Sequence, residues 1–475
     1  MKKFKLLSLV FVRNTRIKAF VFSENFKIFL GGKEVEKTLK ENSFAGFLNK
    51  FFKIKEHKST IQREIVGGLT TFVTMAYIIF VNPNILGEAG MDKGALITVT
   101  CLASFIGTIL AGLWVNIPFA MAPGLGLNAF FTYTLVMGKG ATWEQALGVV
   151  FFSGVVFLIF TLIGIREKVV DSIPASLRLA VSAGIGLFIT FIGLQSLGLV
   201  VDNPATLVSI GPLTTPVILG LVGLVIITVL EIKKVRGAML IGILSTTVLG
   251  LLFKEITLPT TLMSMPPSIA PIAFKLDLAG AFKLAMIGPI FSFMFVDLFD
   301  SVGTIMTCAY EAGMVDKDGR IKKVGKILEA DAVATIAGAV LGTSTTTTYV
   351  ESSAGIAAGA RTGLSAVVTA LMFLAALLFT PIIGMVPSFA TAPALIVVGV
   401  YMFKNVKEID MGDFEVAVPA FITIVTMPLT YSISTGLSLG FMSYVIVSVA
   451  AGDIKKVKPT MWVIALLGLL NLLVH

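Results

Sequence analysis

The sequence predicts an all-α polytopic membrane protein, and its composition, its apolar runs and the placement of its basic residues each support that class. Of its 475 residues, 56% are hydrophobic and only 14% are charged, whereas a typical soluble domain has about 25% charged residues. The mean hydropathy is +0.94. A chain of this composition has too little polar surface to cover its apolar side chains in water, so we expect it to lie in a bilayer.

Long apolar runs recur along the chain, and each run of about 20 residues can cross the hydrocarbon core as a helix. The sequence contains fourteen candidate spans, at 65–86, 95–116, 118–137, 143–164, 174–198, 211–231, 236–253, 283–307, 327–342, 343–360, 362–385, 387–403, 415–432 and 434–451. A last apolar stretch, 460–474, is short for a span. We expect it to lie in the interface, and a fifteenth crossing is the alternative.

The basic residues support this count, because short cytoplasmic loops hold most of the Lys and Arg of a membrane protein. With the N-terminus inside, the cytoplasmic loops and tail contain Arg166, Lys168, Lys233, Lys234, Arg236, Lys317, Arg320, Lys322, Lys323, Lys326, Lys404, Lys407, Lys455, Lys456 and Lys458. The opposite loops contain only Lys93, Lys139, Lys254, Lys275 and Lys283. We therefore expect a multi-pass protein of the cell (plasma) membrane with both termini in the cytoplasm.

The formal charge of +9 is concentrated in residues 1–64, where fifteen Lys or Arg face six Asp or Glu. Such local basicity argues against nucleic-acid binding, which needs a folded cationic face, and favours an arm on the cytoplasmic side. A plain extension is the alternative. The apolar stretch 4–12 is followed by Arg13 and Arg16 where a cleavage site would need small residues, so we expect no signal peptide.

Seven spans followed by seven more form an odd-numbered unit, so the second copy must enter the membrane from the opposite side as an inverted repeat. We expect the first repeat at 65–253, an external linker at 254–282, the second repeat at 283–451 and a tail at 452–475. Weak internal similarity supports this division: 173–188 is similar to 386–403, and 107–124 can be aligned with 337–354.

Several classes of chemistry are excluded by what the spans lack. Cys101 and Cys308 lie in apolar runs, while His57 and His475 lie outside every span, so we expect neither a metal site nor a cofactor. Glycine-rich motifs of nucleotide-binding enzymes do not occur in a strand-to-helix context, and no nucleophile and base pair is apparent. The protein is therefore predicted not to be an enzyme, and acidic side chains must carry any coupling proton.

Two spans differ from lipid-facing helices. Segment 118–130 contains Pro118, Pro123, Gly124 and Gly126, and segment 342–355 contains eight Ser or Thr residues and a glutamate. Both occupy the third position of their repeat, and interrupted spans at corresponding positions mark the binding site of a transporter. We expect short extended segments here, in spans 3 and 10, with free backbone groups that bind a ligand.

Charged residues at membrane depth are costly unless they are paired or functional. Asp297 and Asp300 lie three apart on span 8 and share a helical face, and Glu351 follows the threonines of span 10. These three are the candidates for proton coupling, although Asp300 could instead hold neighbouring helix ends. Glu329 and Asp331 lie close to Lys322, Lys323 and Lys326, so we expect them to form a surface charge pair at a helix start and not a site.

Other side chains near the interruptions are candidates for binding a solute. Asn128 could present its amide to a heterocycle or hydrogen-bond the broken backbone. Phe119 and Tyr349 flank the interruptions, where a ring could stack on a planar ligand, although a core position is the alternative. Carboxylate, amide, hydroxyl and ring together favour a neutral, flat, hydrogen-bonding solute.

The segments 70–86, 121–133, 295–304 and 342–368 resemble those of purine permeases in the nucleobase cation symporter, or xanthine/uracil permease, superfamily. The resemblance is to its AzgA-like adenine/guanine/hypoxanthine branch and covers about residues 55–475. It implies proton-coupled uptake of purine bases by fourteen spans, in which a core domain (spans 1–4 and 8–11) moves against a gate domain (spans 5–7 and 12–14).

Carried onto this chain, the resemblance implies that Asp297 and Glu351 grip the base, with Asp300 and Asn128 nearby. Tyr349 and Phe119 would stack on the base, and Thr348 lies in the backbone segment that would bind its acceptors. A homodimer is possible for such a fold. The alternatives are a uracil or xanthine permease of the same fold, or an anion transporter or channel, against which the scarcity of intramembrane arginine argues.

Overall fold

The computed structural model describes residues 43–164, 172–315 and 321–473. The rest of the predicted arm, residues 1–42, lies outside the described residues, as do the basic loop residues Arg166, Lys168, Lys317 and Arg320. The chain divides into two compact units, Met1–Ile61 and Gln62–His475. The first unit contains helix α3 (Ser43–Phe51), and its boundary lies close to the one expected at residue 64.

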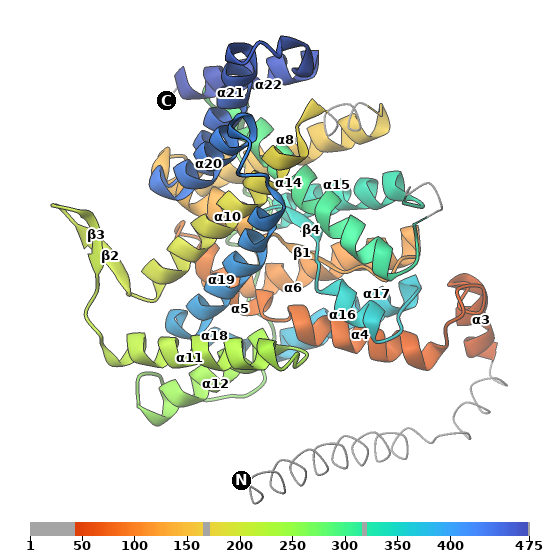
Figure 1. Ribbon diagram of the computed structural model, residues 1–475. Helices are drawn as coiled ribbons and strands as arrows, with labels where there is room; N and C mark the ends of the chain where they lie inside the picture. Colours follow the sequence, from red (N-terminus) through yellow and green to blue (C-terminus); the bar gives the residue numbers. More distant parts are fainter. Residues whose placement is uncertain (1–42, 165–171, 316–320, 474–475) are drawn as a thin grey trace, which may run out of the picture. The chain divides into compact units, whose positions relative to one another are not determined.

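The second unit is built from helices that occupy the predicted apolar runs (Figure 1). The principal ones are α4 (Ile61–Met75), α5 (Ile78–Gly87), α6 (Lys93–Leu110), α8 (Trp143–Leu162), α10 (Ala175–Ser196), α11 (Thr215–Ile232), α12 (Ala238–Leu252), α14 (Leu284–Glu311), α15 (Val324–Leu341), α17 (Gly363–Ala376), α19 (Ser388–Phe403), α20 (Phe414–Leu429), α21 (Ile433–Ala450) and α22 (Pro459–Leu473).

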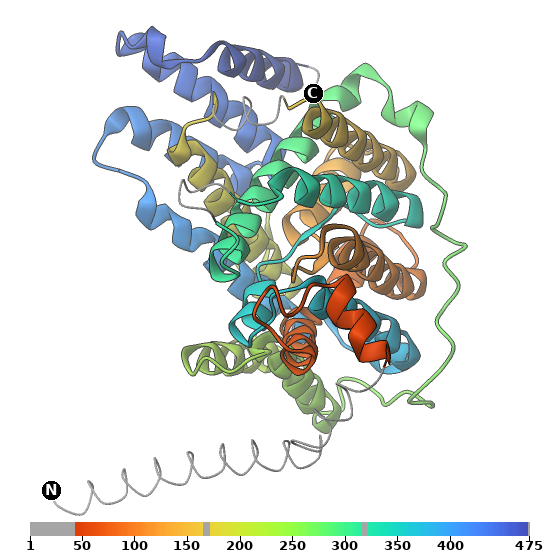
Figure 2. The same ribbon diagram turned by 90° about the vertical axis from the view of Figure 1, so that its right-hand side faces the viewer.

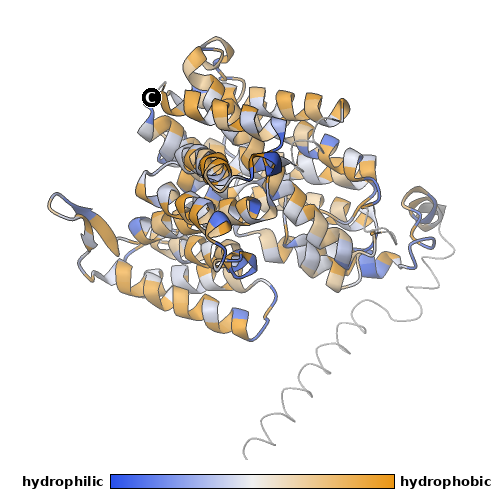
Figure 3. Cartoon of the chain, turned by 45° about the horizontal axis from the view of Figure 1, so that its top comes forward, coloured by the Kyte–Doolittle hydropathy of each residue, from blue (hydrophilic) through white to orange (hydrophobic). Residues whose placement is uncertain are grey.

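Within the described residues, nine helical stretches are long and apolar enough to cross a membrane, and four more apolar helices are shorter. On α11, the exposed residues Ile218, Val222, Val225 and Val229 recur at helical spacing and form an apolar stripe. Figure 3 shows hydrophobic residues over most of the helices. The expected multi-pass membrane fold is therefore present, while the total of fourteen spans remains a prediction.

Capping side chains fix several helix ends. Thr142 and Gln145 form a reciprocal capping box at the start of α8, and the Asp92 carboxylate accepts a hydrogen bond of 2.7 Å from the Ala95 amide at the start of α6. At the end of α15, Gly342 has a φ of 100°, a conformation that glycine adopts without strain. This glycine turns the chain out of α15 and into the hydroxyl-rich segment.

Two short strands lie where the sequence predicts extended segments. Strand β1 (Met121–Pro123) pairs antiparallel with β4 (Thr346–Thr348), and both strands are buried among the helices (Figure 1). Met121 lies opposite Thr348, and Pro123 lies opposite Thr346. Helix α7 (Leu125–Ala129), continued by the π-helical turn η2 (Phe130–Gly138), follows β1, and helix α16 (Ser352–Ala357) follows β4.

Helix packing falls mainly into two groups. Helices α5, α6, α8, α14, α15 and α17 pack against one another around the strand pair, whereas α10, α11, α12, α19, α20 and α21 pack against one another. The assignment of these two groups to a core and a gate domain remains a prediction. After α12, the chain runs along the outside of the helices as an irregular segment before it reaches α13 (Leu278–Ala281) (Figure 2). The segment falls within the predicted external linker at 254–282, whose role as a domain boundary remains a prediction.

The sequence did not predict the hairpin between α10 and α11. Strands β2 (Val200–Asn203) and β3 (Leu207–Ile210) pair antiparallel, and the hairpin projects away from the helices (Figure 1). Leu207 and Ile210 are largely exposed. These short strands were hidden in the sequence because apolar residues continue from the preceding span into them.

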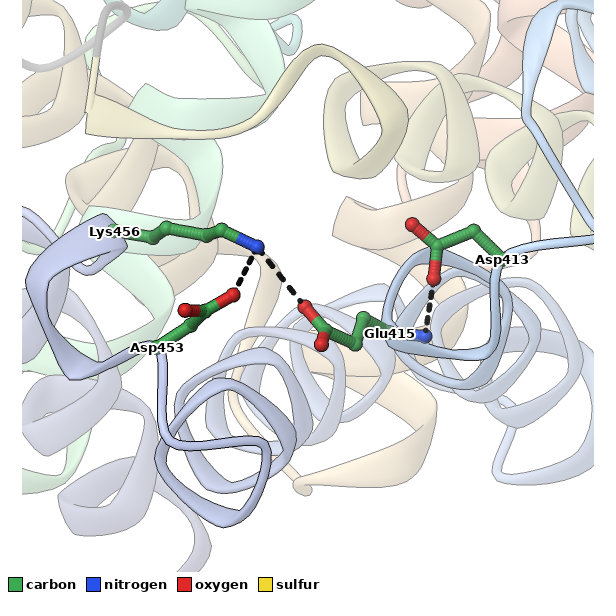
Figure 4. Close-up of polar contacts among 4 residues, drawn as sticks. All are labelled: Asp413, Glu415, Asp453 and Lys456. Atoms are coloured by element: carbon green, nitrogen blue, oxygen red, sulfur yellow. Dashed lines mark hydrogen bonds and ion pairs between the residues drawn. The ribbon is translucent and has the colours of Figure 1, made fainter.

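The C-terminal segment forms helix α22, which packs against α21 and α14. Before it, Lys456 lies between Asp453 and Glu415 and forms ion pairs with both, the one to Glu415 measuring 3.3 Å (Figure 4). The Lys456 ammonium donates hydrogen bonds to Asp453 and Glu415, and these bonds, the one to Asp453 most, raise the pKa of Lys456 above its usual value. In this way a fully exposed lysine links the chain after α21 to the start of α20.

Candidate functional site

Buried polar side chains gather around strand β4. They come from α14 and α15, from the segment around β4 itself, and from the region of β1 and α7. The bilayer offers no water to polar groups at this depth, so each must find a partner within the protein or in a ligand. The partners of these side chains therefore define what the site can do.

Asp331 is the most extensively hydrogen-bonded carboxylate of this group, which corrects its assignment to a surface pair at a helix start. It is 0% exposed and lies eighth in α15, because that helix begins at Val324. Its Oδ2 accepts from the Ser301 hydroxyl at 2.6 Å, and its Oδ1 accepts from the amide of Thr348 at 2.9 Å. Asp331 therefore connects α14, α15 and strand β4, whereas Glu329 is only half-buried.

Asp297 lies on α14, one turn before Ser301, and is 1% exposed. The Thr335 hydroxyl is placed to donate to its Oδ2 at 3.4 Å, and its Oδ1 has no hydrogen-bond partner within the described residues. Asp300, one turn along α14, is half-buried and interacts electrostatically with Asp297, Asp331 and Glu351. The charge of Asp300 is thus coupled to those of the other three carboxylates.

Glu351 lies between β4 and α16. It occupies the N-cap position of α16, but its side chain makes no capping hydrogen bond. Its Oε1 instead accepts a hydrogen bond of 2.6 Å from the hydroxyl of Tyr77, which lies between α4 and α5. The predicted acidic pair therefore uses different partners, since Asp297 faces Thr335 whereas Glu351 faces Tyr77.

Asn128 on α7 is completely buried, and both of its predicted roles remain predictions. Its Oδ1 accepts a short hydrogen bond from the side-chain hydroxyl of Ser344, so the amide links α7 to the hydroxyl-rich segment before β4. Its Nδ2 has no partner within the described residues. The amide nitrogen is thus a buried donor that is available to a ligand.

Phe119, Tyr349 and Thr348 are all buried near the two strands in the sequence. Phe119 is 0% exposed and belongs to the hydrophobic core. The Tyr349 hydroxyl donates to the carbonyl of Pro123, and the Thr348 side chain donates to Asp331 at 3.2 Å. Tyr349 therefore links the segment after β4 to β1, and Thr348 links β4 to α15, while stacking of either ring on a solute remains a prediction.

Orphaned polar atoms surround these residues. Besides Asn128 Nδ2 and Asp297 Oδ1, the hydroxyls of Thr345 and Thr346 are buried without a hydrogen-bond partner within the described residues. Leaving such an atom unsatisfied costs about 1–3 kcal/mol. These four atoms therefore mark where a polar ligand would gain hydrogen bonds.

Sequence reasoning missed three groups that the structure places at the site: Asp331, Ser301 and Tyr77. Asp331 was assigned to the surface because of the lysines that precede it. A signal was nevertheless present, because Asp331 and Thr335, like Asp297 and Ser301, lie four residues apart on one helical face. Tyr77 carried no comparable signal, since its partner Glu351 lies 274 residues away.

Comparison with known proteins supports a transport site. The family model for xanthine/uracil permeases, described as the Permease family, matches residues 62–439. The chain is 42% identical to adenine permease AdeP of Escherichia coli, over 91% of this chain and 97% of that protein. It is 45% identical to guanine/hypoxanthine permease PbuG of Bacillus subtilis, over 87% of this chain and 96% of that protein.

Among solved structures, the fold is similar to the transmembrane domain of the bicarbonate transporter BicA of a cyanobacterium. The TM-score is 0.61 at 16% sequence identity, and the match covers 78% of this chain and 96% of that one. At this identity the likeness concerns the fold alone. From the family match and the full-length relatives together, the chain belongs to the xanthine/uracil permease family and is a membrane permease, not an enzyme.

Proposed function

We propose that this permease imports the purine nucleobases adenine, guanine and hypoxanthine by proton symport across the cell membrane. The observation that carries the substrate class is the near full-length similarity to an adenine permease and a guanine/hypoxanthine permease. The buried carboxylates and orphaned polar atoms around β4 supply matching chemistry, because a purine presents ring N–H groups and ring acceptors along its edges.

In this proposal, Glu351 and Asp297 accept hydrogen bonds from the N–H groups of the base. Asn128 Nδ2 and the hydroxyls of Thr345 and Thr346 are the buried polar atoms left to satisfy its remaining edge. Phe119 and Tyr349 would contact the ring faces after a rearrangement that exposes them. If a carboxylate binds the base only when it is protonated, proton binding and purine binding are coupled, because both favour the same state of the protein.

Asp300 and Asp331 take complementary parts in the proposed coupling. Asp300 is half-buried and interacts electrostatically with the three other carboxylates. Protonation of one carboxylate therefore changes the proton affinity of the others. Asp331 holds strand β4 through the Thr348 amide. A change in the charge of Asp331 on protonation would therefore weaken this hydrogen bond and act directly on β4, the strand proposed to bind the base.

The proposed architecture is a seven-plus-seven inverted repeat of fourteen spans with both termini in the cytoplasm. The two helix groups would be the core and gate domains, and the strand pair would move with the core. Packing within each group is more extensive than packing between the groups, which supports this division. A homodimer is compatible with the scheme.

An anion transporter is the alternative from a different substrate class, because the fold is shared with a bicarbonate transporter. Four carboxylates near the strand pair argue against an anionic substrate, which they would repel. A uracil or xanthine permease is the alternative within the family.

Uptake in a bacterial host that lacks its own nucleobase permeases tests the proposal. We expect cells expressing the protein to accumulate labelled adenine, guanine or hypoxanthine, and a protonophore to abolish the accumulation. Unlabelled purines should compete, whereas uracil, xanthine and bicarbonate should not. Uptake that only uracil or xanthine inhibits, or that persists without a proton gradient, would contradict the proposal.

A further inference from the structure

The segment from Glu351 to Thr362 is fastened to helix α4 at several levels. At one end, the buried Glu64 carboxylate accepts hydrogen bonds from the amides of Arg361 at 3.0 Å and Thr362 at 3.1 Å. At the other end, the Tyr77 hydroxyl donates to Glu351 Oε1 at 2.6 Å. Both partners of Glu64 are backbone groups, so this end of the attachment fixes the main chain.

Between these ends, backbone packs directly against backbone. A Cβ added at Gly355 would lie 2.0 Å from Thr71 Oγ1 and 2.5 Å from the carbonyl oxygen of Gly67. A Cβ added at Gly67 would lie 2.5 Å from the Cβ of Ala360. Because real Cβ atoms do not approach so closely, glycine is needed at both positions. The close approach fixes the distance between α4 and α16, and with it the position from which Tyr77 meets Glu351.

The Tyr77 ring has little freedom of its own. It is 2% exposed, and its backbone lies in the turn that joins α4 to α5, where its carbonyl accepts from the amides of Phe80 and Val81, each at 3.1 Å. One turn earlier, the Thr74 hydroxyl lies 3.4 Å from the Glu351 carbonyl oxygen. The phenol is thus held by packing, and its single donor is directed at one carboxylate oxygen.

We propose that Tyr77 is a positioning residue for Glu351, an assignment that rests on the proposed function. By engaging Oε1, the phenol fixes the rotamer of the carboxylate and leaves Oε2 as the oxygen that meets the substrate. A hydrogen bond donated to a carboxylate also favours its charged form, so Tyr77 sets the pH at which Glu351 takes up a proton. One side chain thereby serves both substrate geometry and proton affinity.

Other titratable groups also face Glu351 and contribute to that pH. They are Asp300 and Cys308 from α14, Tyr349 at the end of β4, Glu231 from α11 and Tyr401 from α19. Among these, Tyr401 and Glu231 belong to the second helix group and also interact electrostatically with each other. Tyr77 differs from them because it is the side chain that donates directly to the Glu351 carboxylate.

The substitution Tyr77→Phe removes only the hydroxyl and keeps the packing of the ring. In the host without nucleobase permeases, we expect the KM for purine uptake to rise about ten-fold, with an unchanged amount of protein in the membrane. The pH of half-maximal uptake should move to higher pH, because the charged form of Glu351 loses a donor. The matched control is Tyr444→Phe on α21, for which neither quantity should change.

A second measurement does not depend on a purine. In the purified full-length protein, infrared difference spectroscopy follows the protonated carboxyl band that the variant Glu351→Gln removes. The midpoint of this band should move to higher pH in Tyr77→Phe and stay unchanged in Tyr444→Phe. An unchanged midpoint, or an unchanged KM with less protein in the membrane, would reduce Tyr77 to a packing residue and overturn the inference.

The two measurements also separate this inference from the proposed function. If the unaltered protein took up no purine, the proposed function would fail, and the infrared midpoint alone would decide whether Tyr77 controls Glu351. If purine uptake occurred but Tyr77→Phe left both readouts unchanged, only the role of Tyr77 would fail.

Discussion

Strands β1 and β4 pair with each other but carry opposite chemistry. Strand β1 consists of Met121, Ala122 and Pro123, whereas β4 consists of three threonines and contacts Asp331 through Thr348. On the β1 side, Thr108 exchanges hydrogen bonds with the backbone of Met121, and Asn128 is the polar side chain that reaches across to the other segment. The two strands of one pair therefore contribute unequally to the site, and the carboxylate contact lies on the β4 side.

The largest expected effect comes from the charged side, at Glu351. We expect Glu351→Gln to lower purine uptake by about a hundred-fold or more, because the substitution removes the charge and the proton carrier and replaces one of the two carboxylate oxygens with a donor. Membrane insertion should be unchanged, as measured by immunoblot of the membrane fraction. Concentrative uptake at the unaltered rate by Glu351→Ala would show that the β4 side does not carry the coupling.

Asp331→Asn should reduce uptake by about ten-fold to a hundred-fold, since it removes a buried charge but keeps an acceptor for the Thr348 amide. Glu329→Gln is the matched control, because Glu329 lies on the same helix two residues earlier and is only half-buried. Initial rates of labelled hypoxanthine uptake distinguish the two variants. Equal rates in both would return Asp331 to a structural role.

On the β1 side, Asn128→Ala should raise the KM by about ten-fold with a smaller change in maximal rate, because one neutral donor to the base is lost. Asn405→Ala is the control, since the Asn405 amide bonds to Ser182 at 3.1 Å in the other helix group. A loss of uptake as large as that of Glu351→Gln would erase the difference between the two sides.

The contact of both strands with α6 offers a test of stability. A Cβ at Gly107 would lie 2.9 Å from the Met121 Cβ and 3.0 Å from the Thr346 Cγ2. We expect Gly107→Ala to destabilise the protein by about 1–3 kcal/mol through overpacking. Thermal unfolding in detergent measures this change, and an unaltered midpoint would show that the strands can yield at this point.

The smallest effect is expected far from the strands, at Lys456. Its ion pairs with Asp453 and Glu415 are exposed to solvent, and such pairs contribute little to stability (Figure 4). Lys456→Ala should therefore leave both purine uptake and the unfolding temperature unchanged within error. A clear loss of uptake would indicate that the link between α20 and α21 takes part in transport.

The helices and the two extended segments could be predicted because their causes are local, whereas the pairing of β1 with β4 joins distant parts of the chain and was not predicted. Apolar runs mark the helices, and proline, glycine and clustered threonines interrupt them at β1 and β4. The partners of the carboxylates could not be predicted in the same way, because Tyr77 meets Glu351 and Ser301 meets Asp331 only through tertiary packing. Asp331 was misplaced because nearby lysines suggested a surface, although the helix carries it seven residues further into the protein.

Purified protein in liposomes that contain a pH-sensitive dye gives the most direct test of the central claim, that carboxylates beside β4 bind a purine and a proton together. An inward adenine or hypoxanthine gradient should acidify the liposome interior with the unaltered protein and leave it unchanged with Glu351→Gln. Purine entry without acidification, or equal acidification by the variant, would contradict the account.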